Sequence, residues 1–115
     1  MPKLEKSPLE MVARFESAAA RHPEARRRQM FGYPALFVGG NLATGLFASG
    51  WMVRLGDADL VSLLALPGAT PFSPMAGRTM RGYGLLPPDV VADDAALDGW
   101  LERAIAFARS LPPKG

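Results

Sequence analysis

The sequence predicts a single α+β domain in which an antiparallel sheet of about five strands packs with three helices. Apolar residues recur at helical spacing near both ends of the chain, whereas the middle consists of short apolar runs separated by glycine turns. The chain has 115 residues, of which 49% are hydrophobic, and it has no cysteine. A chain of this length buries roughly two thirds of its unfolded surface, so it forms a core without disulfides. We therefore expect one domain over residues 1–115, with its core over about residues 8–111.

The first helix is predicted over about residues 8–20. Ser7, followed by Pro8 and Glu10, has the pattern of a capping box with proline at the first helical position. The dipeptide of His22 and proline then ends the helix. This histidine is the only one in the chain, and we expect it to be exposed to solvent in the turn.

Four strands joined by hairpins are predicted between residues 25 and 55, because glycine turns interrupt this stretch. Their approximate ranges are residues 25–31, 35–38, 42–47 and 51–55. The last of them alternates apolar and polar side chains, as a half-buried strand does. The second is apolar on both faces, so we expect a partner or a long loop to cover the sheet face that the helices leave open.

A second helix, a loop, a fifth strand and a final helix are predicted in the rest of the chain. The second helix begins at Asp57, the loop covers residues 69–77, and the fifth strand covers about residues 79–86. Asp93 or Asp94 caps the final helix. The apolar stripe of that helix consists of Leu97, Trp100, Leu101, Ala104, Ile105 and Ala108. The predicted order of elements is therefore α-β-β-β-β-α-β-α.

The residue types in the chain argue against most kinds of catalysis. Without cysteine there is no thiolate nucleophile, redox pair or iron–sulfur cluster, and a single histidine suits neither a metal site nor a Ser/His pair. We expect no enzyme activity and no cofactor. The N-terminus has no signal-peptide pattern, and no stretch approaches the roughly 18 to 20 apolar residues of a membrane span, so we expect a cytoplasmic protein without a membrane partner.

Three consecutive arginines are the strongest candidate for a polar binding site. On a strand Arg26 and Arg28 point to one face and Arg27 to the other. Together with Arg81 or Arg78 on a neighbouring strand, they could contact a phosphate or a carboxylate. The alternative interpretation is a charged strand that discourages edge pairing. The formal net charge of +2 does not by itself indicate a strong nucleic-acid binder.

Several short motifs occur in a characteristic order. Residues 28–33 read RQMFGY, residues 36–41 read LFVGGN, residues 80–83 read MRGY, and residues 97–100 read LDGW. Over about residues 10–110 the chain resembles the TfoX/Sxy N-terminal domain family. The resemblance implies a two-layer domain with helices on one face of an antiparallel sheet, similar to secretion-chaperone-like and YjbR-like domains. It implies little about activity.

We expect a non-enzymatic regulatory or protein-interaction module that binds a protein partner, or a second copy of itself, through the exposed sheet face. The candidate interface residues are Leu36, Phe37 and Val38. The alternative is a nucleic-acid-binding transcriptional regulator that contacts phosphates with Arg26, Arg28 and Arg81. The name-giving family members carry a further C-terminal domain and activate competence genes, a role that is not expected for a chain ending at Gly115.

Overall fold

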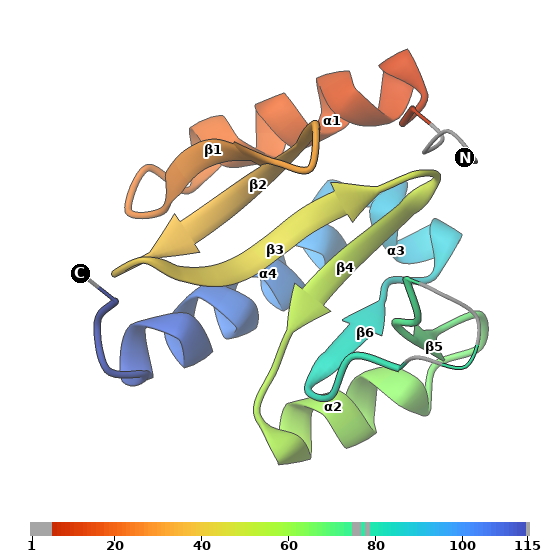
Figure 1. Ribbon diagram of the computed structural model, residues 1–115. Coiled ribbons are helices and arrows are strands. Elements are labelled where there is room, and N and C mark those ends of the chain that lie inside the picture. Colours follow the sequence, from red (N-terminus) through yellow and green to blue (C-terminus); the bar gives the residue numbers. More distant parts are fainter. Residues whose placement is uncertain (1–5, 75–76, 78, 115) are drawn as a thin grey trace.

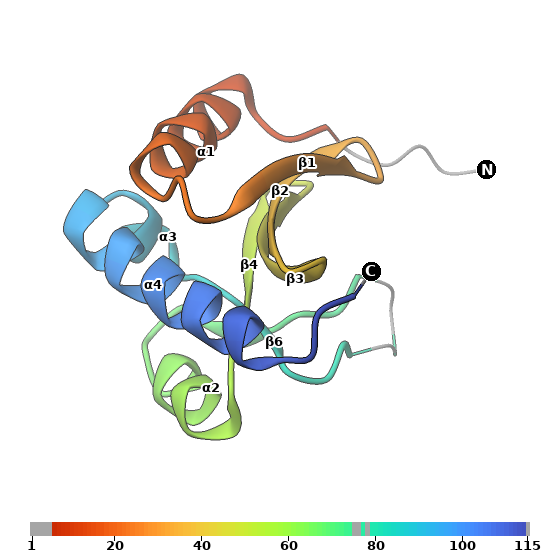
Figure 2. The same ribbon diagram turned by 90° about the vertical axis from the view of Figure 1, so that its left-hand side faces the viewer.

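An antiparallel sheet with helices on one of its faces forms the fold (Figures 1 and 2). The computed structural model describes residues 6–74, 77 and 79–114. The helices are α1 (Leu9–Arg21), α2 (Asp57–Leu64), α3 (Pro88–Val91) and α4 (Asp94–Ser110). The strands are β1 (Arg26–Met30), β2 (Tyr33–Val38), β3 (Asn41–Phe47), β4 (Gly50–Arg54), β5 (Thr70–Pro71) and β6 (Tyr83–Leu85). None of the helices in the described ranges has the length and apolar character that crossing a membrane requires.

The order of strands in the sheet is β1-β2-β3-β4-β6-β5. The first four pair consecutively and antiparallel, so the predicted meander of hairpins is confirmed. The sheet has six strands rather than about five, because Thr70 and Pro71 in the predicted loop pair with Leu85 and Gly84 of β6. Proline is tolerated in β5 because this strand forms the edge of the sheet, where a missing N–H costs no ladder bond.

The start of α1 differs from the prediction. Pro8 is the N-cap residue, and no side chain caps the helix. The hydroxyl of Ser7 instead donates a hydrogen bond to the carbonyl oxygen of Ala48 at 2.6 Å, in the turn between β3 and β4. The predicted capping box is therefore wrong, because the serine hydroxyl forms its hydrogen bond with a distant hairpin instead of with the helix backbone. At α4 the predicted cap is confirmed, since the Asp93 carboxylate accepts from two backbone N–H groups of the first turn.

The main core lies between the sheet and the helices. The predicted stripe of α4 is buried there except for Trp100, which is half-buried, and α1 contributes Phe15. At the centre, the indole N–H of Trp51 donates to Thr44 Oγ1 at 2.9 Å, and this hydroxyl donates to the carbonyl oxygen of Met52 at 2.6 Å. Both polar groups are thus satisfied inside an apolar core, as buried polar groups usually are.

The opposite face of the sheet carries a second, smaller apolar cluster. Its buried members are Ala35, Leu42, Met52 and Phe72. Phe72 follows β5 in the chain, so the segment after β5 supplies part of the cover that the two-sided second strand led us to expect. The remaining part of this face forms an open groove.

Candidate functional site

The groove on the sheet face opposite the helices has a volume of about 620 Å³. Small-molecule and cofactor sites commonly have volumes of roughly 300–1,000 Å³. We call it the apolar groove and define it by Met30, Phe31, Phe37, Gly40, Leu42, Phe47, Met52, Arg54, Phe72, Pro74, Met80, Tyr83 and Lys114. Figure 2 shows the helices on one side of the sheet and the C-terminal end of the chain on the other, where Lys114 lines the groove.

The rim of the apolar groove exposes large apolar side chains. Phe31 is 76% exposed and Met80 is 37% exposed. Phe31 and Gly32 form the two-residue turn between β1 and β2, and both have positive φ, of 55° and 82°. This is the backbone of the hairpin turn that best matches strand twist, but an aromatic residue rarely adopts it. A strained, exposed phenylalanine next to an apolar groove suggests a binding role.

The floor of the apolar groove contains a positive charge without a carboxylate partner. Arg54 is half-buried, and its guanidinium lies over the rings of Tyr83 and Phe107, 5.6 and 5.8 Å from their centroids. Among the described residues no carboxylate lies within 4 Å of it. Burial raises the pKa of Tyr83 against the opposing effect of Arg54, so the phenol keeps its proton at neutral pH. The described lining contains two cations, Arg54 and Lys114, and no acidic residue.

The arginines of β1 alternate as predicted. Arg27 points towards α1, where its Nε and Nη2 donate to the two carboxylate oxygens of Glu16 at 3.1 and 2.5 Å. Arg28 lies on the other face, with its guanidinium 5.7 Å from the centre of the Phe37 ring. Arg26 pairs in register with Phe37 and therefore shares that face. Two arginines thus lie next to the apolar groove.

Arg81 does not join the arginines of β1. It is exposed in the turn before β6, and three strands, β2, β3 and β4, separate β6 from β1. The expectation of a neighbouring strand is therefore wrong, because β6 pairs with β4 at the other side of the sheet. Arg78 lies outside the described residues.

The three predicted interface residues of β2 have different environments. Leu36 is 1% exposed in the core on the helical side, and Val38 packs against the same core. Only Phe37 lies on the groove face. The expectation that Leu36 contacts a partner is corrected, because successive strand side chains alternate between faces and this one is covered by the helices.

His22 also differs from the expectation of a solvent-exposed turn residue. It is 5% exposed, and its Nε2 lies 3.0 Å from Oδ1 of Asp98 on α4. Arg21 Nε donates to the same carboxylate at 2.9 Å. These contacts join the end of α1 to α4. Within the described ranges, no group of three His, Cys, Asp or Glu residues could hold a metal ion.

Asp98 makes the stability of this helix pair depend on pH. Partial burial tends to raise the pKa of Asp98, but hydrogen bonds from Arg21 and His22 and their charges outweigh it, so the pKa lies below its ordinary value of 3.8. The ionised carboxylate therefore stabilises the fold above pH 3.8, and this contribution is lost as the pH falls through the folded-state pKa.

We expect Asp98→Asn to lower the free energy of unfolding by about 1 kcal/mol at pH 5, because the contact is partly exposed. The difference from the unchanged protein is expected to shrink below pH 3.8. Urea unfolding of both proteins from about pH 5 to pH 2 measures it. Asp89→Asn is the control, since Asp89 is exposed and has no ion-pair partner in the described ranges. A difference that grew towards pH 2 would contradict this assignment.

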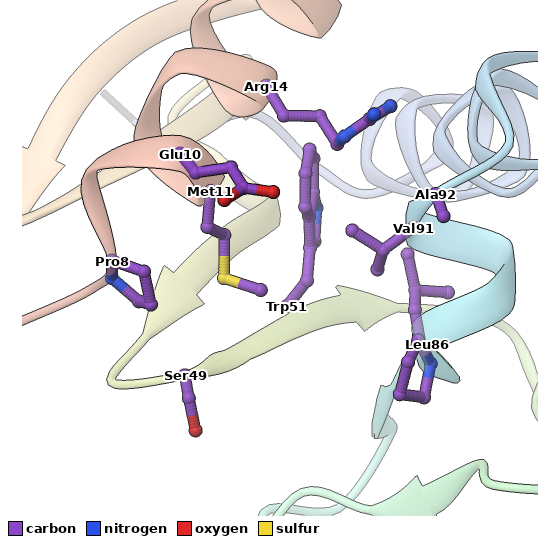
Figure 3. A pocket seen from close by; sticks show the side chains of 10 residues that line it. Pro8, Glu10, Met11, Arg14, Ser49, Trp51, Leu86, Val91 and Ala92 are labelled. Atoms are coloured by element: carbon purple, nitrogen blue, oxygen red, sulfur yellow. The ribbon is translucent and has the colours of Figure 1, made fainter.

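A second cavity, of about 410 Å³, lies between the start of α1, the turn from β3 to β4, and α3 (Figure 3). Glu10 and Met11 line one wall, Val91 lines the other, and Trp51 lies between them. The arginine of this cavity, Arg14, already donates to Asp94 at 2.8 Å. We therefore place the candidate site in the apolar groove, where the arginine has no carboxylate partner.

The apolar groove could be predicted only in part. Phe31 is exposed because it lies in the two-residue turn between β1 and β2, and nothing in the local pattern indicates that it borders a groove. Arg54 occupies a polar position of the alternating strand at residues 51–55, and that pattern by itself indicates no site. No local signal indicates that Phe72 folds back over β3 and β4 to border the groove.

Comparison with known proteins gives one family. The model of the TfoX N-terminal domain matches residues 17–108, which include β1 to β6 and most of the groove lining. No curated protein matches the chain. No solved structure matches it.

Proposed function

The chain belongs to the TfoX N-terminal domain family, and from this premise we propose that it is a non-enzymatic interaction module that binds a protein partner in the apolar groove. The observation that carries the proposal is an open groove of about 620 Å³ with exposed aromatic and methionine side chains on its rim. The polar side chains of its described lining are those of Arg54, Tyr83 and Lys114, which suit binding better than bond cleavage.

The exposed rim favours a protein over a small ligand. A small molecule inside the groove would leave Phe31 and Met80 in water, whereas a protein surface would cover them as well. Aromatic residues and methionine are enriched at protein interfaces, and buried aromatic anchors supply much of the binding energy. We therefore expect the Phe31 ring to contribute most to the binding energy when a partner covers it.

The charges near the groove argue against a second copy of the same chain. Groove-to-groove contact would bring Arg54, Lys114 and Arg28 of two copies together without carboxylates between them. Like charges across an interface suppress the wrong pairing. A partner with negative charge fits this face better.

Nucleic-acid binding by the arginines receives less support. Arg27 is paired with Glu16, Arg28 lies over an aromatic ring, and Arg81 is three strands away. A phosphate-tracking surface needs several free cations in a row. The groove, in contrast, collects apolar side chains from β1, β2, β3 and β4 in one place.

A photo-cross-linking experiment tests the proposed function. Phe31→p-benzoylphenylalanine places the cross-linker on the rim of the groove, and the same change at Val61 is the matched control. Val61 is 70% exposed but lies on α2, away from the groove lining. After irradiation in the native host, we expect a protein adduct at position 31 and little at position 61, with mass spectrometry locating the cross-link in an apolar segment.

The same experiment separates the alternatives. Adding Phe37→Ser to the chain with the cross-linker at position 31 is expected to reduce the adduct, because Phe37 lines the groove. Equal labelling at positions 31 and 61 would contradict a specific groove partner. A nuclease-sensitive adduct would favour the nucleic-acid alternative.

A further inference from the structure

We propose that Arg54 binds a carboxylate of the partner segment and thereby makes the apolar groove selective for apolar segments that carry an acidic residue. This inference rests on the proposed function and names the chemistry of the partner. It starts from the half-buried guanidinium on the groove floor, which has no carboxylate within 4 Å among the described residues.

The partners of Arg54 satisfy only part of its bonding capacity. Tyr83 and Phe107 contact the guanidinium through their rings, at 5.6 and 5.8 Å. Cation–π contacts stabilise the charge, but the guanidinium also has five N–H donors that can form a fork matching a carboxylate. A carboxylate is the group that completes such a site, and charge-assisted hydrogen bonds to it are about twice as strong as neutral ones.

The surroundings of Arg54 link this charge to the apolar floor. Met52 precedes it by two residues on β4, so the two side chains share one face of the sheet, roughly 6.5 Å apart along the strand. Tyr83 is the register partner of Arg54. Its phenol keeps its proton and can donate a hydrogen bond to the same partner segment. An extended partner segment presents residues i and i+2 on one face at the same spacing, so an apolar residue two positions from a glutamate or aspartate fits.

Charge also selects the occupant. The described lining holds Arg54 and Lys114 and no acidic residue, and Arg28 adds a third cation beside Phe37. A segment with lysine or arginine would meet repulsion there, and a neutral segment would leave Arg54 unpaired beneath it. Burying an unpaired charge is costly, and pairing with an acidic residue offsets that cost.

Three synthetic peptides test the inference. Each is acetylated and amidated, with the sequence Leu-Thr-Phe-Thr-X-Thr, where X is glutamate, glutamine or lysine. Their dissociation constants are measured by NMR titration with the unchanged protein, Arg54→Gln and Arg103→Gln. Arg103 is the matched control, because it also stacks on an aromatic ring, Trp100, but lies on α4 outside the groove.

We expect the glutamate peptide to bind the unchanged protein about tenfold more tightly than the glutamine peptide, and the lysine peptide to bind most weakly. In Arg54→Gln, checked for folding by circular dichroism, the glutamate and glutamine peptides are expected to bind equally well. Arg103→Gln is expected to keep the tenfold preference. Shifted resonances should belong to groove residues such as Phe31, Phe37 and Met52.

The outcomes separate this inference from the proposed function. Equal binding of the glutamate and glutamine peptides to the unchanged protein would overturn the role of Arg54 and leave the groove as a binding site. Failure of all three peptides to bind at about 1 mM would count against the proposed function and this inference together. If decanoate binds more tightly than every peptide and displaces them, the occupant is a small amphiphile, which overturns the peptide assignment.

Discussion

Trp51→Ala is expected to lower the free energy of unfolding by about 3–5 kcal/mol, the usual cost of removing a large buried aromatic side chain. Trp51 is 1% exposed, and its ring packs on Phe15 with centroids 5.1 Å apart. Its indole N–H also donates to the hydroxyl of Thr44. The substitution therefore removes one packing contact between α1 and the sheet and leaves a cavity at the centre of the fold.

Urea unfolding measures this effect. It is followed by far-ultraviolet circular dichroism rather than by tryptophan fluorescence, because the substitution removes one of the fluorescent side chains. Trp100→Ala is the matched control, since it removes the other tryptophan. Trp100 is half-buried and stacks on Arg103 at 4.5 Å, so we expect less than half of the loss. A larger loss for Trp100 than for Trp51 would show that the core is centred elsewhere.

Leu101→Ala is expected to cost about 2–5 kcal/mol, because a fully buried leucine loses its transfer free energy and leaves a cavity. Leu101 is 0% exposed and belongs to the main core cluster. It lies on α4, which contacts β2, β3 and β4. A cavity at this position therefore weakens the attachment of the longest helix to the middle of the sheet.

The neighbouring residue provides the control for this prediction. Glu102→Ala changes an exposed position of the same helix turn, where substitutions usually shift stability by no more than about 0.5 kcal/mol. Both variants are compared with the unchanged protein by urea unfolding. If Leu101→Ala cost as little as Glu102→Ala, the core would have repacked around the missing side chain, contrary to our expectation.

Most elements predicted from local patterns are present in the structure, which also contains the short helix α3 and the two-residue strand β5. The apolar stripe of α4, its aspartate cap and the four hairpin strands depend on residues a few positions apart, and the structure confirms them. The features that were missed depend on distant residues. Ser7 bonds to Ala48, and His22 is buried because Asp98, 76 positions away, lies beside it. Contacts between residues so far apart in the sequence do not affect the local periodicity of apolar residues.

In the candidate site, too, the features that depend on nearby residues were predicted and those that depend on distant residues were missed. Strand alternation correctly separated Arg27 from Arg26 and Arg28, because side-chain direction in a strand follows from position alone. The two-sided second strand correctly indicated that the open face would be partly covered. The groove itself needs the strand order, which brings β6 and Tyr83 next to β4 and Arg54. The sequence contained these residues without indicating that they meet.

The position of α4 in the chain has a consequence for synthesis on the ribosome. This helix begins only at Asp94, after every strand, yet it supplies five buried side chains of the main core. The hairpins can form while the chain emerges, but their helical face stays uncovered until α4 has left the exit tunnel. A nascent chain arrested before that point is expected to be held by chaperones, and the emergence of α4 from the tunnel is expected to release it.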